Sequence, residues 1–147
     1  MKIIKLSQNP EYKIIPYNYL KSHWGDEVDL DRLFEMVLSD SDIPEFFLAL
    51  DRDKVIGMVL VDFSFYEESN KPWLLSLYVL EKYRGKGVGG KLVKHLEQRV
   101  KNLGFSKIWL DSYNSGAYYE RPEHNYTYYN DMYRKEDKYV KVYFKEL

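Results

Sequence analysis

Residues 77–92 read Leu-Tyr-Val-Leu-Glu-Lys-Tyr-Arg-Gly-Lys-Gly-Val-Gly-Gly-Lys-Leu, and this stretch decides the fold of the chain. An apolar, strand-forming run ends near its start, four glycines occupy six positions in its middle, and a helix-forming run begins at its end. Glycine lets backbone N–H groups line a concavity, and the first turn of a helix adds unpaired donors at the positive end of its dipole. The stretch therefore predicts a strand, loop and helix that together bind a phosphate-bearing molecule.

Other interpretations fit parts of this stretch. The glycines from Gly85 to Gly90 match the dinucleotide pattern G-x-G-x-x-G, and Asp111 follows at a suitable distance, but a charged segment separates the strand from the first glycine. Residues 85–91 match G-x-x-x-x-G-K, but Leu92 stands where a nucleotide triphosphatase needs Ser or Thr. The glycines alternatively serve only a tight turn, although one or two glycines are enough for that.

A third phosphate-binding pattern fits the whole stretch. Arg84, Gly87 and Gly89 form R-x-x-G-x-G, and Leu-Tyr-Val ends five residues before the arginine. This arrangement resembles the acetyl-CoA signature of the GNAT N-acetyltransferase superfamily. The resemblance implies acetyl-CoA as cosubstrate, no metal, loop amides around the CoA pyrophosphate, and strand backbone groups along the pantetheine arm. The implied cofactor-binding residues are Leu77, Tyr78, Val79, Arg84, Gly85, Lys86, Gly87, Val88, Gly89 and Gly90.

A second patch resembles the same family. Leu110 is followed by Asn114-Ser115-Gly116-Ala117, similar to the family's apolar residue and N-x-x-A pattern. In that family the Asn side chain commonly hydrogen-bonds the pantetheine arm, which makes Asn114 a further candidate for cofactor binding. The sequence Tyr-Asn-Ser-Gly is equally typical of a turn, so both interpretations stay open.

The periodicity of apolar residues predicts one α/β domain over residues 1–147. Strands are expected over residues 1–6, 46–50, 55–65, 73–79, 107–110 and 139–144, and helices over residues 12–24, 28–38, 88–103 and 124–133. A loop is expected over residues 113–123. The resemblance implies the GNAT-like arrangement for these elements: a mixed, mostly antiparallel central sheet flanked by helices, whose splayed central strands form the acetyl-CoA cleft.

Composition narrows the location and the partners. The 147 residues include no cysteine, and neither a secretory leader nor an apolar stretch of membrane-spanning length is recognisable, so we expect a cytoplasmic protein without a membrane partner. The formal net charge of −1 argues against nucleic acid. Residues 26–45 carry a net charge of −7 and residues 81–107 a net charge of +6. The basic segment suits a polyphosphate cofactor, while the acidic one either attracts a cationic acceptor or is a solvated helix face.

Acetyl transfer to an amine needs a group that removes a proton and a group that protonates the departing thiolate. In many GNAT enzymes a tyrosine before the last strands is the proton donor, and residues 132–138 resemble that stretch, which implies Tyr133 with Tyr129 as the alternative. The family spacing from Asn114 points instead to position 121, which is Arg121, so another tyrosine stays open. Several tyrosines crowd this part of the chain: Tyr118, Tyr119, Tyr126, Tyr128, Tyr129 and Tyr133. The base has no motif, and its candidates are Asp62, Glu67, Glu68, His23, His95 and His124.

The predicted function is therefore transfer of an acetyl group from acetyl-CoA directly to a primary amine, with a small cationic acceptor such as a polyamine or an aminoglycoside preferred. A protein or peptide amine is the second enzymatic alternative. A sensor that binds acetyl-CoA without turnover is the alternative from another class. The resemblance also implies a homodimer.

Overall fold

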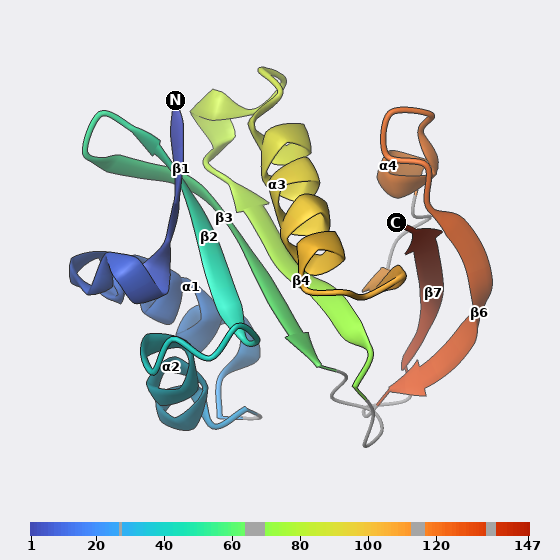
Figure 1. The fold of residues 1–147 in the computed structure, drawn as a ribbon, viewed down its shortest axis with the longest axis horizontal. Coiled ribbons are helices and arrows are strands. Elements are labelled where there is room, and N and C mark those ends of the chain that lie inside the picture. The colour runs from blue at the N-terminus through green and yellow to red at the C-terminus, as the bar shows by residue number, and fades with distance from the viewer. Residues whose placement is uncertain (27, 64–69, 113–116, 135–137) are drawn as a thin grey trace.

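The computed structural model describes residues 1–26, 28–63, 70–112, 117–134 and 138–147. These residues form a seven-stranded sheet of order β1-β2-β3-β4-β5-β7-β6, in which β4 and β5 run parallel and the other neighbours are antiparallel (Figure 1). The strands are β1 (Lys2–Lys5), β2 (Glu45–Asp51), β3 (Lys54–Phe63), β4 (Pro72–Val79), β5 (Lys107–Ser112), β6 (Thr127–Arg134) and β7 (Lys138–Glu146). The mixed, mostly antiparallel sheet agrees with the predicted fold class.

Helices connect the first strands and flank the sheet. The α-helices are α1 (Ile14–Trp24), α2 (Leu30–Leu38), α3 (Val88–Asn102) and α4 (Ala117–Glu120), and short 3-10 helices cover η1 (Leu6–Gln8), η2 (Pro10–Tyr12) and η3 (Glu81–Tyr83). Pro16 lies in the first turn of α1, where its missing N–H costs no helical hydrogen bond. Asp29 caps α2 by accepting a hydrogen bond from the Arg32 N–H at 3.1 Å. Gly104, at φ 98°, follows the end of α3 as the sequence predicts.

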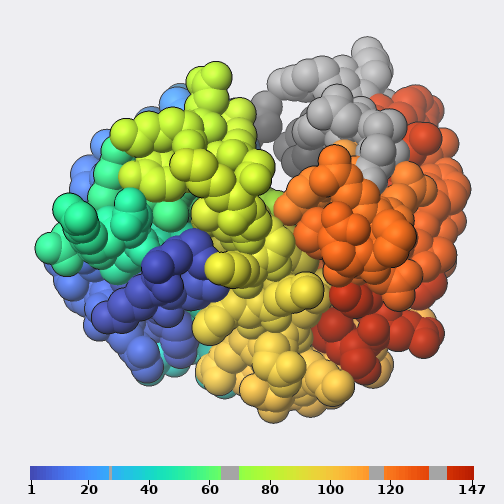
Figure 2. Space-filling model, turned by 90° about the horizontal axis from the view of Figure 1, so that it is seen from above, coloured from blue at the N-terminus to red at the C-terminus, as the bar shows by residue number. Residues whose placement is uncertain are grey.

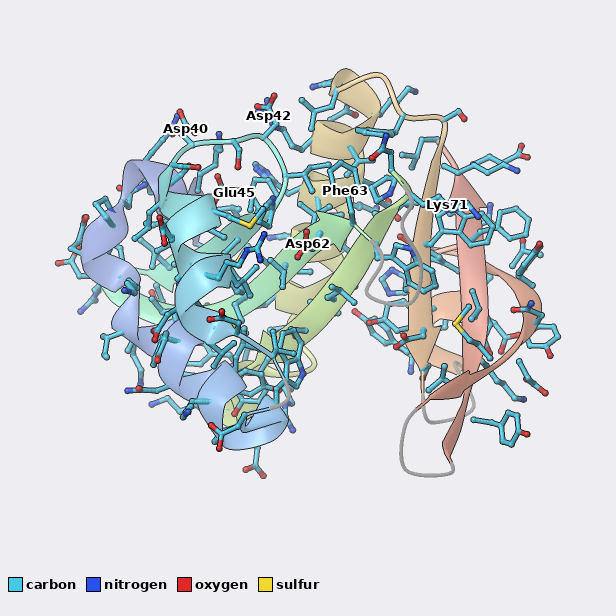
Figure 3. All side chains as sticks on the ribbon, turned by 90° about the horizontal axis from the view of Figure 1, so that it is seen from below. Asp40, Asp42, Glu45, Asp62, Phe63 and Lys71 are labelled. Atoms are coloured by element: carbon cyan, nitrogen blue, oxygen red, sulfur yellow. The ribbon has the colours of Figure 1, made fainter. Side chains whose placement is uncertain are left out.

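The sheet has a core on each face. Leu92, Val93 and Leu96 of α3 pack against Val59 and Val61 of β3 on one face. On the opposite face the buried residues of α1 and α2 pack against alternate residues of β2 and β3: Leu20, Leu30, Leu33, Phe34 and Val37 meet Phe46, Leu48, Met58 and Leu60. Figure 3, seen from below, shows α3 on one side of the sheet and α1 and α2 on the other. Alternation along β3 therefore assigns each of its side chains to one of the two faces.

The two central parallel strands pair at one place. Trp73 of β4 and Trp109 of β5 are the register partners, and their buried rings lie 6.3 Å apart. Ser76 of β4 has a left-handed φ of 52°, and the register between β3 and β4 shifts opposite it. This irregularity bends β4 between Trp73 and Val79. Beyond the Trp73–Trp109 pair, the described residues of β4 and β5 share no further register pair, so the two strands separate. This separation is the central opening that the predicted fold requires.

Most predicted elements are confirmed, and one is wrong. The expected helix over residues 124–133 is the strand β6, paired with β7 from Thr127 to Arg134. Residues 127–134 are rich in tyrosine and begin with threonine, types that favour strands, and pairing with β7 determines the conformation of this segment. The expected loop over residues 113–123 contains the short helix α4 in its described part. No helix among the described residues is long and apolar enough to cross a membrane.

Candidate functional site

A cavity of about 850 Å³ opens where β4 and β5 separate. One wall is the end of β4 with the glycine loop and the first turn of α3, and the facing wall comes from the end of β5, α4 and the segment after it. Figure 2, seen from above, shows the yellow-green loop and the orange α4 segment on the two sides of a hollow. The volume lies in the range of small-molecule sites, so the fold provides a site where the sequence predicts one.

The glycine loop holds the conformation that an anion site needs. Gly85 and Gly87 have φ of 74° and 83°, and a β-carbon at either position would meet nothing within 4 Å. Gly87 directly precedes α3, and the first turn of this helix lines the cavity. The backbone N–H groups of a first helical turn have no partner within the helix. Backbone donors and the positive end of the α3 dipole are therefore available to a phosphate.

Arg84 braces the strand that enters this loop. Its Nε donates to the Val79 carbonyl at 2.8 Å, and its guanidinium lies 5.5 Å from the centre of the Tyr78 ring. Tyr78 in turn packs on Tyr19 of α1 at 4.3 Å between ring centres, and Tyr19 stacks on His23 at 4.0 Å. This stack connects α1 to the loop and fixes the end of β4.

Nine of the predicted cofactor-binding residues line the cavity: Leu77, Tyr78, Val79, Arg84, Gly85, Gly87, Val88, Gly89 and Gly90. Lys86 lies on the same loop but is not a lining residue, and its Nζ lies 5.8 Å from the centre of the Tyr83 ring. Asn114 lies outside the described residues. The sequence thus finds one wall of the cavity, while the role of each residue in cofactor binding stays a prediction.

The facing wall was not predicted as a cofactor site. It consists of Ser112, Tyr118, Tyr119, Arg121, Glu123 and His124. The Tyr118 hydroxyl reaches across to α3, since it lies 2.9 Å from where a β-carbon on Gly89 would stand. Residues 118–124 match none of the motifs read from the sequence. The signals that pointed to this segment were the crowded tyrosines, the family spacing that leads to Arg121, and His124 as a candidate base.

His124 is the most buried polar residue of that wall. The side chain is 4% exposed, its ring lies 4.3 Å from the Tyr118 ring, and its Nδ1 has no hydrogen-bond partner among the described residues. Burial lowers the His124 pKa, Lys145 and Arg121 lower it further, and Glu123 and Glu97 act in the opposite direction. The imidazole is therefore held neutral in the free protein.

Tyr129, one of the two predicted proton donors, does not lie in this wall. Tyr129 is 57% exposed on β6, with its ring 5.1 Å from that of Trp109, and it does not line the cavity. Tyr133 lies on β6, and its side chain is outside the described part of the structure. Tyr118 and Tyr119 are lining residues, and burial raises the pKa of both. Tyr126, another tyrosine of this part of the chain, is buried and donates to Glu97 at 2.8 Å.

The candidate bases are spread over the fold. Asp62 lies on the α2 side of β3, and burial raises its pKa to about 6 while the Phe63 N–H, which donates to it at 2.7 Å, acts against that shift. His23 stacks on Tyr19, and its Nδ1 lies 2.8 Å from the Tyr19 carbonyl. His95 packs on Phe47, and burial lowers its pKa. Glu67 and Glu68 lie outside the described residues.

Contacts within the fold occupy much of the acidic segment. Glu45 is fully buried and accepts from the Ser7 N–H at 3.2 Å, and Asp40 accepts from the Ser7 hydroxyl at 3.1 Å. Asp42 pairs with Arg99 of α3 at 2.7 Å. These carboxylates connect η1, the start of β2 and α3, although the side chains of Asp40 and Asp42 stay 62% exposed. Figure 3 shows Asp40, Asp42 and Glu45 together near the start of β2. In the described part of the chain, no group of three or more acidic or histidine side chains is arranged to hold a metal.

The fold and the cavity together define a domain with an open glycine loop at the start of α3, between two splayed strands. The sequence matches the Acetyltransferase (GNAT) family over residues 9–126. This chain belongs to that acetyltransferase family. No curated protein sequence matches it significantly.

Solved structures share the fold at low sequence identity. An aminoglycoside 6'-acetyltransferase type Ii superposes with a TM-score of 0.76 at 20% identity, covering 99% of this chain and 97% of that one. An aminoglycoside 6'-N-acetyltransferase complexed with coenzyme A gives 0.73 at 18% identity, with the same coverage. A GNAT family acetyltransferase from Elizabethkingia anophelis with acetyl-CoA bound gives 0.62 at 19% identity, covering 90% of this chain and 91% of that one.

Proposed function

We propose that the chain transfers an acetyl group from acetyl-CoA to a primary amine of a small cationic molecule. The observation that carries the proposal is the cavity at the start of α3, with the open left-handed glycines Gly85 and Gly87 on one wall. Two features fit CoA. Backbone N–H groups of the glycine loop and of the first turn of α3 suit its pyrophosphate. The cavity also continues along Leu77 to Val79, where an extended pantetheine arm would lie. Acetyl-CoA supplies the activated acyl group.

The reaction needs two proton transfers: one proton leaves the ammonium of the acceptor, and one is donated to the CoA thiolate. The amine nitrogen forms a bond to the acetyl carbon, the carbon–sulfur bond breaks, the ammonium proton leaves, and the thiolate gains a proton. Tyr118 is our candidate for the proton donor, because its hydroxyl spans the cavity between α4 and Gly89. Its raised pKa keeps it protonated at neutral pH, as a donor must be. Tyr133 stays the alternative, and Tyr129 is disfavoured by its place on the outer part of β6.

The acceptor class rests on the similarity of the fold to known acetyltransferases. Two fold neighbours are named for aminoglycosides, which are small polyamines, and this favours a small molecule over a protein or peptide amine. A sensor that binds acetyl-CoA without turnover is the competing function. The position of a tyrosine hydroxyl inside the cavity favours an enzyme.

The test is calorimetric titration of the purified chain with acetyl-CoA, followed by a thiol-release assay against polyamines, aminoglycosides and lysine peptides. Binding with thiol release for one small-amine class supports the proposal. Binding without release for any amine favours the sensor, and release with peptides alone moves the acceptor to the protein class. An absence of acetyl-CoA binding would overturn the cofactor assignment.

Homodimerisation belongs to the same proposal, because it comes from the family resemblance. Sedimentation velocity of the full chain at micromolar concentration tests it directly. A dimer mass supports it, and a monomer mass contradicts it.

A further inference from the structure

A row of side chains crosses the sheet at the point where the two central strands still pair. Asp62 of β3 is the register partner of Trp73 of β4, Trp73 of Trp109 of β5, and Trp109 of Phe144 of β7. Register partners in a sheet project from the same face. Because Asp62 follows Met58 and Leu60 in alternation along β3, that face is the one opposite α3, toward α1 and α2.

The row combines a carboxylate with aromatic surface. Asp62 makes no ion pair with any residue that the structure describes, and its one hydrogen-bond donor there is the Phe63 N–H. Next to it lie the two indole rings, which are nearly fully buried and pack with Phe144. A partly buried carboxylate beside indole faces is a favourable environment for an ammonium group, which gains both a counter-charge and cation–π attraction.

A cation already occupies part of this row. Lys71, directly before β4, places its Nζ 5.1 Å from the centre of the Trp109 ring. Lys71 is exposed, so solvent reaches its ammonium group. Figure 3 shows Asp62 and Lys71 near the beginning of β4, from neighbouring parts of the sheet. The protein's own ammonium thus lies within cation–π distance of the Trp109 ring.

The row also has a fixed distance from the proposed reaction site. Trp73 and Leu77 are four residues apart on β4, and Leu77 lines the cavity. An extended strand rises about 3.3 Å per residue, so the two positions lie about 13 Å apart, or somewhat less because of the irregularity at Ser76. Leu77 packs toward α3 and the row projects from the opposite face, so a molecule that reaches both would pass through the opening between β4 and β5 and would need amines separated by about 10 Å or more.

We propose that Asp62, Trp73 and Trp109 bind a second ammonium group of the acceptor, that Lys71 stands in for it in the free protein, and that the substrate therefore carries at least two separated amines. This inference rests on the proposed function. It selects polyamines and aminoglycosides over monoamines, since a monoamine that reaches the acetyl group leaves the row unfilled.

Calorimetry with the full chain saturated with CoA tests the proposal, with spermidine (three amines) and kanamycin A (four amines) as polyamine probes and butylamine as the monoamine. The wild type should bind either polyamine probe at least about tenfold more tightly than butylamine, given a second charge-assisted contact. Asp62→Asn should weaken that probe about tenfold. Lys71→Met should tighten it a few-fold by removing the competing cation. Asp53→Asn, the same charge change in the exposed turn between β2 and β3, should leave binding unchanged.

Each result decides the matter. The proposed second ammonium site is overturned if Asp62→Asn binds the probes as tightly as wild type or if Lys71→Met shows no gain. It is also overturned if Asp53→Asn shows the same loss as Asp62→Asn, or if neither wild type nor Lys71→Met binds any probe. CoA binding in the same samples separates this from the proposed function, because loss of the row leaves CoA affinity intact, whereas a chain that does not bind CoA fails at the earlier step. Circular dichroism of each variant confirms that it is folded.

Discussion

The Tyr118 hydroxyl lies 2.9 Å from the point where a β-carbon on Gly89 would stand. Any side chain introduced at position 89 of α3 would therefore compete with the Tyr118 hydroxyl of α4 for the same space. Val79 of β4 lies 3.7 Å from the same point. The contact joins the two walls of the cavity at the first turn of α3. The φ of Gly89 is not in the left-handed region, so its backbone conformation does not require glycine. Glycine is needed there because the Tyr118 hydroxyl approaches α3 so closely.

Gly89→Ala should lower stability in the wild-type background and raise it when Tyr118 is Phe. Overpacking costs about 1 kcal/mol or more, while Ala gains up to about 1 kcal/mol over Gly in a helix. Removing the hydroxyl removes the clash and leaves the gain. A double-mutant cycle by urea unfolding should therefore give a coupling energy of about 1 kcal/mol. Additive effects of the two changes would show that the residues do not compete.

Gly87→Glu should abolish acetyl-CoA binding, because the new carboxylate would lie beside the phosphates in the open space of the loop. Gly87→Ala is the matched control. Both variants carry the strain of a left-handed φ, about 1–2 kcal/mol, but Ala adds no charge. Calorimetry should find binding weakened in Gly87→Ala and absent in Gly87→Glu. Wild-type affinity in Gly87→Glu would remove the loop from the site.

Asp62 should make stability depend on pH. Its pKa of about 6 in the folded chain exceeds the unfolded value near 3.9, so the folded state binds more protons between these values. Stability therefore falls as pH rises from about 4 to 6 and stays lower above that. Asp62→Asn should be more stable than wild type by about 1–3 kcal/mol at pH 7.5 and equal to it near pH 3.5. Urea unfolding at both pH values measures this, and an equal gain at both would contradict the shifted pKa.

Much of this fold could be predicted because local patterns and tertiary contacts agree. The stripe on α3 and the glycine loop are local features, and the β2–β3 hairpin has a polar turn between apolar runs. The prediction of a helix over residues 124–133 failed because the local pattern and the tertiary contacts disagree there. Tyr126, Tyr129 and Tyr133 have helix-like spacing, and pairing with β7 determines the conformation instead.

The site divides in the same way. One wall follows from glycines whose backbone geometry is written in a short motif. The other depends on Tyr118 and His124, which reach the cavity because α4 folds back toward α3, and no local pattern encodes that approach. The row from Asp62 to Trp109 likewise exists through strand register alone, across residues far apart in the chain.

Glu97 should hold the two sides of the cavity together. This buried residue of α3 accepts from the Tyr126 hydroxyl at 2.8 Å and pairs with Lys145 of β7 at 3.1 Å. Glu97→Ala leaves a partly buried ammonium and a buried phenol without this partner and should cost about 3 kcal/mol in urea unfolding. Glu97→Gln, which still accepts from Tyr126, should cost less. Asp26→Asn breaks the exposed pair with Lys21 and should change nothing measurable, while equal losses in all three variants would argue against a specific role of Glu97.

Tyr118→Phe should lower kcat for acetyl transfer by about a hundredfold and leave the affinity for acetyl-CoA nearly unchanged, because only the hydroxyl that protonates the thiolate is lost. Tyr129→Phe should keep wild-type kcat, since that ring packs on Trp109 away from the cavity. Steady-state thiol release with the best amine of the panel measures both, and a pH profile adds a second readout, as the decline of kcat at high pH should disappear in Tyr118→Phe. Wild-type kcat in Tyr118→Phe together with a loss in Tyr133→Phe would return the proton donor to β6.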